Sequence, residues 1–283
     1  MGSRLPKGLP VIRAARILAA ASLLACAAAP LAAQRHRSGD DWLASCRDRD
    51  NWGDSRARFC EIRNAGFKAG GAVSVDPGVN GAIRVSGWDR DSVDVTAKIQ
   101  AQARSDEEAQ ALAHDIRITA SGGTISADGP AASGRRSWSV SFDVMVPRRT
   151  DLTVRTENGP ISVDDVAGKM DLHAVNGPLH LEDVAGDVHA RTVNGPLVIT
   201  LSGDHWDGTG LDSETENGPV VLTLPARYSA HLETGTVNGP MLLDIPVTVQ
   251  GRINFHHIST DIGSGGPPVR AVTTNGPVTV RNH

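Results

Sequence analysis

The chain has 283 residues, with 28 lysines and arginines against 32 aspartates and glutamates, so its formal net charge is −4. This acidic balance argues against a general nucleic-acid-binding protein, which needs a basic surface. Glycine (30 residues) and proline (16) are frequent and aromatic residues make up 4% of the chain, which favours short strands joined by turns over a helical bundle.

Residues 1–33 have the layout of a secretory signal peptide, with a basic start, an apolar stretch from Ile17 to Ala29 and a small-residue end at Ala33. The apolar stretch is too short for a membrane span, and no later segment approaches about 18 apolar residues. We expect cleavage after Ala33 and export to the periplasm or cell surface, with no transmembrane span left in the mature chain. A lipoprotein leader is the alternative, because Leu23-Leu24-Ala25-Cys26 resembles a lipoprotein box and would place a lipid anchor on Cys26.

A segment with one pair of cysteines follows the leader. Residues 34–66 carry clusters of arginine and aspartate together with Cys46 and Cys60, and we expect an extended or loosely folded segment. An even pair of cysteines in an exported chain predicts a disulfide between them. The alternative is two free buried thiols.

Residues 67–149 are predicted to form an antiparallel β-layer with one short helix. Ser105 is a good N-cap and acidic residues fill the first turn that follows, which predicts a helix over 105–114. This layer is expected to cap one end of the repeat region and so prevent end-to-end aggregation. Strands are predicted over 72–75, 82–85, 92–100, 115–120, 124–127 and 137–146.

The tripeptide Asn-Gly-Pro occurs six times in residues 150–283, and the first three copies are 18 residues apart. Residues on both sides of each copy alternate between apolar and mostly polar, which indicates strands with one buried face. Glycine permits positive φ, asparagine tolerates left-handed backbone, and proline suits an interrupted ladder. The six corners are Asn158-Gly159-Pro160, Asn176-Gly177-Pro178, Asn194-Gly195-Pro196, Asn217-Gly218-Pro219, Asn238-Gly239-Pro240 and Asn275-Gly276-Pro277.

Regular spacing with identical corners favours coils that stack in parallel, although an Asn-Gly turn alone would suggest an antiparallel hairpin. A single unit buries about five apolar side chains at roughly 2 kcal/mol each, less than the backbone entropy of 18 ordered residues at roughly 1–2 kcal/mol each, so the units must stack to fold. The predicted fold is therefore all-β, a β-solenoid of about six Asn-Gly-Pro coils capped by the N-terminal β-layer.

The run Val79-Asn80-Gly81-Ala82-Ile83-Arg84-Val85-Ser86-Gly87-Trp88-Asp89, with repeats such as Thr192-Val193-Asn194-Gly195-Pro196-Leu197-Val198-Ile199, resembles the bacterial "putative adhesin" domain of unknown function. The resemblance covers about residues 67–283. It implies an exported or envelope-associated β-repeat protein and supplies no catalytic residues.

We find no catalytic constellation, cofactor motif or metal-ligand spacing in the sequence. His256-His257 with Asp261 is better explained as a solvated loop, because adjacent histidines on a strand point to opposite faces. Acids on several coils would suit a polysaccharide-degrading β-helix, but they fall mainly near corners and lack an aromatic platform.

The surface suggested for contacts is an outward column on successive coils, formed by Arg155, His173, Arg191 and Glu214, together with Trp206 in the insertion 203–210. Such a stripe would suit an anionic glycan or lipid head group, and the alternative is a solvated face with cross-strand ion pairs. We expect a non-catalytic envelope protein, an adhesin-like structural or binding module whose partner is a glycan or an envelope protein. A glycan-binding or glycan-degrading β-helix and a lipid-anchored envelope-stress or sensory component are the alternatives.

Overall fold

The computed structural model describes residues 31–48, 56–246 and 256–282, which contain two helices and 20 strands. The chain divides into two compact units, residues 1–38 and 39–283, and both sheets lie in the second. The helices are α1 (Leu31–Arg47) and α2 (Asp106–Asp115). The first seven strands are β1 (Ala57–Lys68), β2 (Ala72–Asp76), β3 (Ile83–Trp88), β4 (Ser92–Ala103), β5 (Arg117–Ser121), β6 (Thr124–Asp128) and β7 (Ser137–Pro147).

The remaining strands belong to the Asn-Gly-Pro region. They are β8 (Asp151–Asn158), β9 (Ile161–Asp164), β10 (Ala167–Asn176), β11 (Leu179–Glu182), β12 (Ala185–Asn194), β13 (Leu197–Thr200), β14 (Gly210–Asn217), β15 (Val220–Leu224), β16 (Ala230–Asn238), β17 (Met241–Asp244), β18 (His257–Ile262), β19 (Pro268–Asn275) and β20 (Val278–Asn282).

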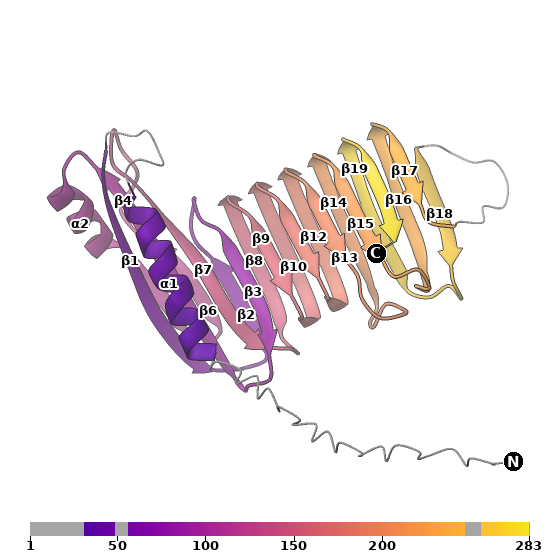
Figure 1. Ribbon diagram of the computed structural model, residues 1–283, viewed down its shortest axis with the longest axis horizontal. Coiled ribbons are helices and arrows are strands. Elements are labelled where there is room, and N and C mark those ends of the chain that lie inside the picture. The colour runs from indigo at the N-terminus through magenta and orange to yellow at the C-terminus, as the bar shows by residue number, and fades with distance from the viewer. Residues whose placement is uncertain (1–30, 49–55, 247–255, 283) are drawn as a thin grey trace, which may run out of the picture. The chain divides into compact units, whose positions relative to one another are not determined.

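The strands form two ten-stranded sheets, whose parallel strands run side by side in Figure 1. Sheet A has the order β1-β4-β7-β3-β9-β11-β13-β15-β20-β17, and sheet B has the order β18-β16-β19-β14-β12-β10-β8-β2-β6-β5. Both sheets mix parallel and antiparallel pairs and neither is closed. The chain is thus mostly β, as the composition and the alternating pattern predict.

Each Asn-Gly-Pro corner joins a strand of sheet B to a strand of sheet A, and equivalent strands of neighbouring units pair in parallel. The prediction of parallel pairing rather than hairpins is confirmed. The alternating residues explain the arrangement, because the apolar side of each strand is buried between the sheets while the polar side faces outward. Val154, Leu172 and Leu197, for example, are at most 1% exposed.

The order of the units in the stack differs from their order in the chain. The last unit, β19 and β20, lies between the units β14–β15 and β16–β17 in both sheets. The long segment between Asn238 and Asn275 allows this return, and part of it forms β18, which pairs antiparallel with β16. The end of the stack is therefore the unit β16–β17, not the last unit in the chain.

The front part of the chain joins the same two sheets. Antiparallel pairing links β1 to β4, β4 to β7 and β5 to β6, as expected for a capping layer. In contrast, β2 pairs in parallel with β6 and β8, and β3 with β7 and β9, so these two strands extend the parallel stack. The predicted boundary at 149/150 therefore falls within continuous sheets.

Helix α2 agrees with its prediction, since the Ser105 side chain accepts a hydrogen bond from the backbone N–H of Glu108. Ala109, Leu112 and Ala113 are its buried residues. Figure 1 shows α2 beside β1 and β4.

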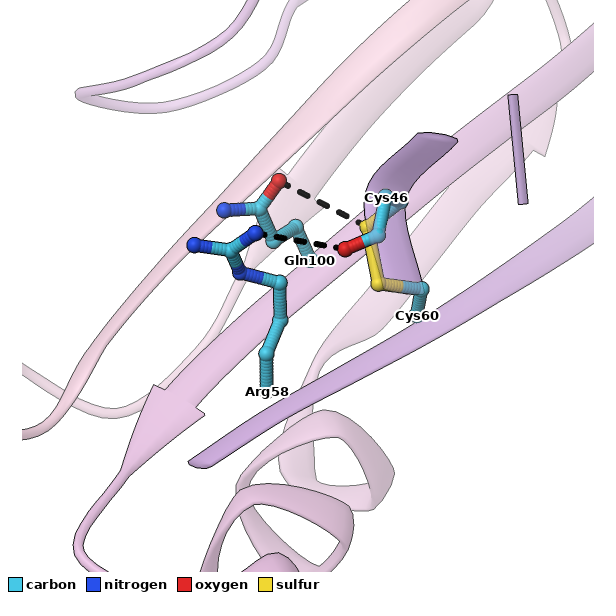
Figure 2. The surroundings of a disulfide bond; sticks show 4 residues. All are labelled: Cys46, Arg58, Cys60 and Gln100. Carbon is cyan, nitrogen blue, oxygen red and sulfur yellow. Dashed lines mark hydrogen bonds between the residues drawn. A yellow bond between two sulfur atoms is a disulfide. The ribbon is translucent and has the colours of Figure 1, made fainter. Parts of the chain in front are cut away.

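The expectation of an extended or loose segment over residues 34–66 is wrong, because the described part contains helix α1 and strand β1. The disulfide prediction is confirmed: Cys46 near the end of α1 is bonded to Cys60 on β1 (Figure 2). Both cysteines are buried, and the Arg58 guanidinium donates a hydrogen bond of 3.3 Å to the Cys46 carbonyl. The bond thus joins α1 to a strand that pairs along its whole length with β4.

The predicted leader lies outside the described residues except for Leu31–Ala33, the first residues of α1, and Cys26 also lies outside them. Cleavage after Ala33 therefore stays a prediction. Neither described helix is both long and apolar enough to cross a membrane.

Candidate binding surface

The six Asn-Gly-Pro corners and Asn80-Gly81 stack as one ladder along the edge where the two sheets meet. In each step the asparagine Nδ2 donates to the Oδ1 of the next asparagine, at 2.8–3.2 Å. The order of the ladder is Asn238, Asn275, Asn217, Asn194, Asn176, Asn158 and Asn80. The ladder agrees with the strand register, which pairs the same asparagines across neighbouring strands of sheet B.

The backbone repeats the same pattern at each inner corner. Each glycine N–H donates to the carbonyl of the neighbouring asparagine, as Gly195 does to Asn217 at 3.0 Å, and the residue after each proline donates to the neighbouring proline carbonyl, as Leu197 does to Pro219 at 2.9 Å. Threonines two residues before the asparagine add a bond to a glycine carbonyl, for example Thr215 Oγ1 to Gly195 at 2.8 Å. The polar groups of the corner are thereby paired without water.

Close approach of the backbones, rather than left-handed geometry, explains the glycine at each corner. A Cβ on any of the six corner glycines would lie 2.1–2.2 Å from the carbonyl oxygen of a neighbouring glycine. Only Gly159 among them has a positive φ, and none of the asparagines does. Among the described residues, the non-glycine residues with positive φ are Asp165 and Asp183, at corners on the opposite edge. The expectation that the corners need positive φ at glycine and left-handed backbone at asparagine is therefore wrong for every corner residue except Gly159.

The outer face of sheet B carries the column that the sequence suggested. The strand register aligns Arg155 with His173, His173 with Arg191 and Arg191 with Glu214. A second outward column lies two residues earlier on each strand and contains Asp171, His189, Asp212, Arg270 and Glu233. The two columns supply ion pairs to each other, and Arg155 pairs with Asp171 at 3.1 Å.

Two arginines in these columns hold a network of four carboxylates. Arg191 contacts Glu214 and Glu216, both at 2.5 Å. Hydrogen bonding to Glu216, followed by the charge of Glu214, raises the pKa of Arg191.

Arg270 forms the second half of the network, with Asp212 at 2.5 Å, Glu233 at 3.4 Å and Glu214 at 3.6 Å. Partial burial lowers the pKa of Arg270, but the hydrogen bond to Asp212 and the charges of the three carboxylates outweigh burial and raise it. Both guanidinium groups therefore stay charged and held by carboxylates. The column is not a free basic stripe.

All of the network except Asp212 lines a groove of about 740 Å³ that runs over β12, β14, β19, β16 and β18. Its charged lining residues are Arg191, Glu214, Glu216, Glu233 and Arg270, and Val237, His256 and His257 lie at one end. Val237 is 66% exposed. The groove therefore combines charged side chains on a regular sheet with two valines, Val237 and Val272.

The other suggested contact residues do not join this groove. Arg155 and His173 belong to the same column but lie further along the sheet, on β8 and β10. Trp206 is 2% exposed, and its Nε1–H donates to the Gly186 carbonyl at 3.0 Å. The suggestion that Trp206 lies on a contact surface is wrong, because the insertion 203–210 folds the indole into the core instead of presenting it to solvent.

Arg270 and Glu233 are the functional candidates that the sequence reading missed. Each lies five residues before an Asn-Gly-Pro asparagine, as Asp212 does, so aligning the repeats at this position would have found the column. Their contact with Asp212 depends on the stack order, which the sequence does not reveal. The histidines 256 and 257 and Asp261 form no metal site: among the described residues no three His, Cys, Asp or Glu side chains are placed to hold a metal ion.

Comparisons with known proteins return solved structures of low similarity. One is described as a "putative cell adhesion protein" from Clostridium sporogenes, at 12% identity and a TM-score of 0.45, covering 80% of this chain and 100% of that one. A second is a "putative adhesin" from Bacteroides fragilis, at 10% identity and a TM-score of 0.40, covering 79% of this chain and 97% of that one. A third is a "putative lipid binding protein" from Parabacteroides distasonis, at 9% identity and a TM-score of 0.31, covering 78% and 96%.

The descriptions of the first two structures agree with the resemblance to the "putative adhesin" domain that the sequence motifs indicate. At these identities and TM-scores they carry no conclusion about what the chain binds. No family model matches the chain, and no curated protein matches it.

Proposed function

We propose that this chain is an exported, non-catalytic binding module of the bacterial cell envelope, wound as a β-solenoid, with its binding surface on the outer face of sheet B. The observation that carries the proposal is the groove around Arg191 and Arg270, where a parallel sheet holds charged side chains at a fixed spacing of about 4.8 Å between strands. The leader-like first 33 residues and the sequence resemblance to the "putative adhesin" domain support export.

The charge of the groove favours a cationic partner. Three carboxylates, Glu214, Glu216 and Glu233, line the groove with two guanidinium groups, so its charged lining has a net charge of −1. Asp212, which pairs with Arg270 outside the lining, is the fourth carboxylate of the network. Both guanidinium groups are already held by carboxylates, so the acceptors that remain would suit amines or guanidinium groups of a partner. The partner proposed is a basic segment of another envelope protein.

A glycan is the second candidate, since a groove with clustered acids is also the arrangement that a glycan-binding β-helix needs. Among the described residues, however, no tryptophan or tyrosine lines the groove, and Trp206 and Tyr228 are buried. The groove thus lacks the aromatic surface against which sugar rings commonly stack, and this favours the protein partner.

A binding titration with a fluorescent oligolysine peptide tests the ligand class, with an oligoglutamate peptide of the same length as its control. Glu214→Gln and Glu233→Gln should each weaken oligolysine binding by about tenfold, which corresponds to about 1.4 kcal/mol. Glu182→Gln, an exposed acid at the end of β11 in sheet A, is the matched control and should leave binding unchanged. Equal loss in all three variants would contradict the placement of the site. Binding of a neutral glucan oligosaccharide that only the first two variants abolish would favour the glycan.

Export is tested separately by intact mass and N-terminal peptide mapping of the native protein. A start at Gln34 supports a secreted module, and a lipid-modified Cys26 supports the lipid-anchored alternative. A retained leader would contradict export.

A further inference from the structure

The chain contains seven Asn-Gly steps, the six corners and Asn80-Gly81. Asparagine is a thermolabile residue. Glycine after it leaves the following backbone nitrogen unshielded by a side chain, so that nitrogen can attack the asparagine amide. Three of the seven steps lie in the identical tetrapeptide Val-Asn-Gly-Pro, at 175–178, 193–196 and 237–240. These three have the same local sequence, so any difference in their reactivity comes from the fold.

In six of the seven steps the fold engages the nitrogen that would attack. The N–H groups of Gly81, Gly159, Gly177, Gly195, Gly218 and Gly276 each donate to an asparagine carbonyl in the neighbouring rung, at 2.9–3.1 Å. The side-chain amides of the inner asparagines are held from both sides, since Asn194 donates to Asn176 and accepts from Asn217. Attack at an inner corner would have to break these bonds first.

The rung of Asn238 is different because it ends the ladder. Among the residues that the structure describes, the Gly239 N–H has no acceptor and the Asn238 Oδ1 has no donor. Strand β17, which follows the corner, is an edge strand of sheet A, and among the described residues the backbone bonds between β16 and the segment that leads into β18 reach Thr236, whose N–H donates to the His256 carbonyl at 2.9 Å, and no further toward Asn238. Asn238 is exposed, as Asn176 and Asn194 are, so the missing partners and not exposure distinguish this rung. Local opening is easiest at such an end.

We propose that Asn238 is a site of spontaneous backbone-assisted deamidation, which the fold directs to this rung. Hydroxide removes the Gly239 N–H proton, and the nitrogen attacks Cγ of Asn238. The new N–Cγ bond closes a five-membered succinimide while the Cγ–Nδ2 bond breaks and ammonia leaves with a proton from water. Water then adds to either succinimide carbonyl and opens the ring to aspartate or isoaspartate. The reaction uses only water and involves no change of oxidation state.

The product changes the end of the stack. A carboxylate at position 238 places an acceptor opposite Asn275 Oδ1, where Asn238 Nδ2 now donates at 2.8 Å, so the last ladder bond is lost. Isoaspartate also lengthens the backbone at the corner. The modified rung β16–β17 is therefore expected to open more readily, and this consequence holds whether or not the groove binds a ligand.

The test is peptide mapping by mass spectrometry, with fragmentation that separates aspartate from isoaspartate, after native full-length protein has been held in mildly alkaline buffer. We expect Asn238 to convert at least about tenfold faster than Asn176 and Asn194, a difference of about 1.4 kcal/mol in activation free energy. The same protein in concentrated urea is the control, where the three identical tetrapeptides should convert at similar rates.

Equal native rates at the three positions, faster conversion at an inner position, or a native Asn238 that stays intact while the denatured chain reacts would each overturn the proposal. Asn238→Gln checks the assignment, and it should remove the native mass change while leaving the six other steps as slow as before.

Discussion

The inner corners of the stack and its terminal corner have the same sequence and different surroundings. Val193-Asn194-Gly195-Pro196 lies between two rungs and uses its glycine N–H, its proline carbonyl and both ends of its side-chain amide. Val237-Asn238-Gly239-Pro240 has a neighbour on one side, so half of these groups have no partner among the described residues. The tetrapeptide therefore encodes a complementary surface that needs a second copy, not a turn that is stable by itself.

The two ends of the stack also differ. At one end β7 pairs with β3 in sheet A and β6 pairs with β2 in sheet B. The Cys46–Cys60 disulfide joins α1 to β1 in the same part of the chain. At the other end β18 covers part of β16, while no strand in the described part of the chain pairs with the outer edge of β17. Met241 and Leu243 of β17 are half-buried, whereas their counterparts Val278 and Val280 on the next rung are fully buried. An uncovered edge is a place where a stack opens or pairs with another chain.

The largest expected effect is a methyl group placed at an inner corner. Gly195→Ala puts a Cβ 2.2 Å from the Gly177 carbonyl oxygen, and we expect a loss of about 3 kcal/mol or more in the free energy of unfolding. Gly239→Ala meets the same contact, but its rung can move outward, so we expect less than half of that loss. Gly70→Ala, with open space around it, is the control and should change stability by less than about 0.5 kcal/mol. Urea denaturation of the three variants measures this ranking, and equal losses at 195 and 239 would contradict it.

Breaking the disulfide tests the covered end. Cys46 and Cys60 are 14 residues apart in sequence, and the chain-entropy relation gives about 3 kcal/mol for a loop of about 15 residues. The Cys46→Ala, Cys60→Ala double variant should lose that amount by urea denaturation. The amide of Gly195 should keep its hydrogen-exchange protection in this variant at low denaturant. Loss of that protection would show that the front part and the repeats unfold as one unit.

Tyr228, the only tyrosine of the chain, gives a pH-dependent probe next to the terminal unit. Burial, followed by the charge of Asp204, raises the pKa of Tyr228 to about 12. An unfolded tyrosine ionises near pH 10. The stability that the neutral, buried Tyr228 side chain contributes is therefore complete below pH 10 and is lost between pH 10 and 12, which amounts to roughly 2–3 kcal/mol of the free energy of unfolding. Spectrophotometric titration of tyrosinate should show the raised pKa in native protein, and Tyr228→Phe should remove this part of the alkaline loss. A native pKa near 10 would contradict it.

The smallest expected effect compares two asparagines of the ladder. Asn194→Ala removes a donor to Asn176 and an acceptor for Asn217, whereas Asn238→Ala removes only a donor to Asn275. At about 0.5–1 kcal/mol for each exposed bond, we expect losses of about 1–2 kcal/mol and about 0.5–1 kcal/mol. Equal losses in paired denaturation curves would mean that the ladder bonds do not stabilise the stack.

The sequence predicts those features that depend on local patterns. The six corners, the inward apolar residues, helix α2 with its Ser105 cap and the Cys46–Cys60 pair all follow from short-range spacing. The repeat also places Arg155, His173, Arg191 and Glu214 in one column, because strands paired in register keep equal distances from their asparagines in line.

What the sequence does not reveal depends on long-range packing. Trp206 lies in a polar insertion that reads as an exposed loop, yet its indole is buried and bonded to the Gly186 carbonyl. The insertion of β19 between β14 and β16 brings Arg270 to Asp212 and Glu233, and no local pattern encodes that order. The repeat pattern thus predicts the position of Arg191 beside Glu214, whereas the position of Arg270 depends on the insertion of β19 between β14 and β16.

Residue-resolved hydrogen exchange of the corner glycine amides tests the comparison between inner and terminal rungs most directly. The structure predicts strong protection of Gly177, Gly195, Gly218 and Gly276, whose N–H groups donate to neighbouring asparagine carbonyls, and exchange close to the unfolded rate for Gly239. Protection of Gly239 equal to that of Gly195 would contradict an open terminal rung. It would also mean that the two copies of Val-Asn-Gly-Pro do not differ in their backbone hydrogen bonding.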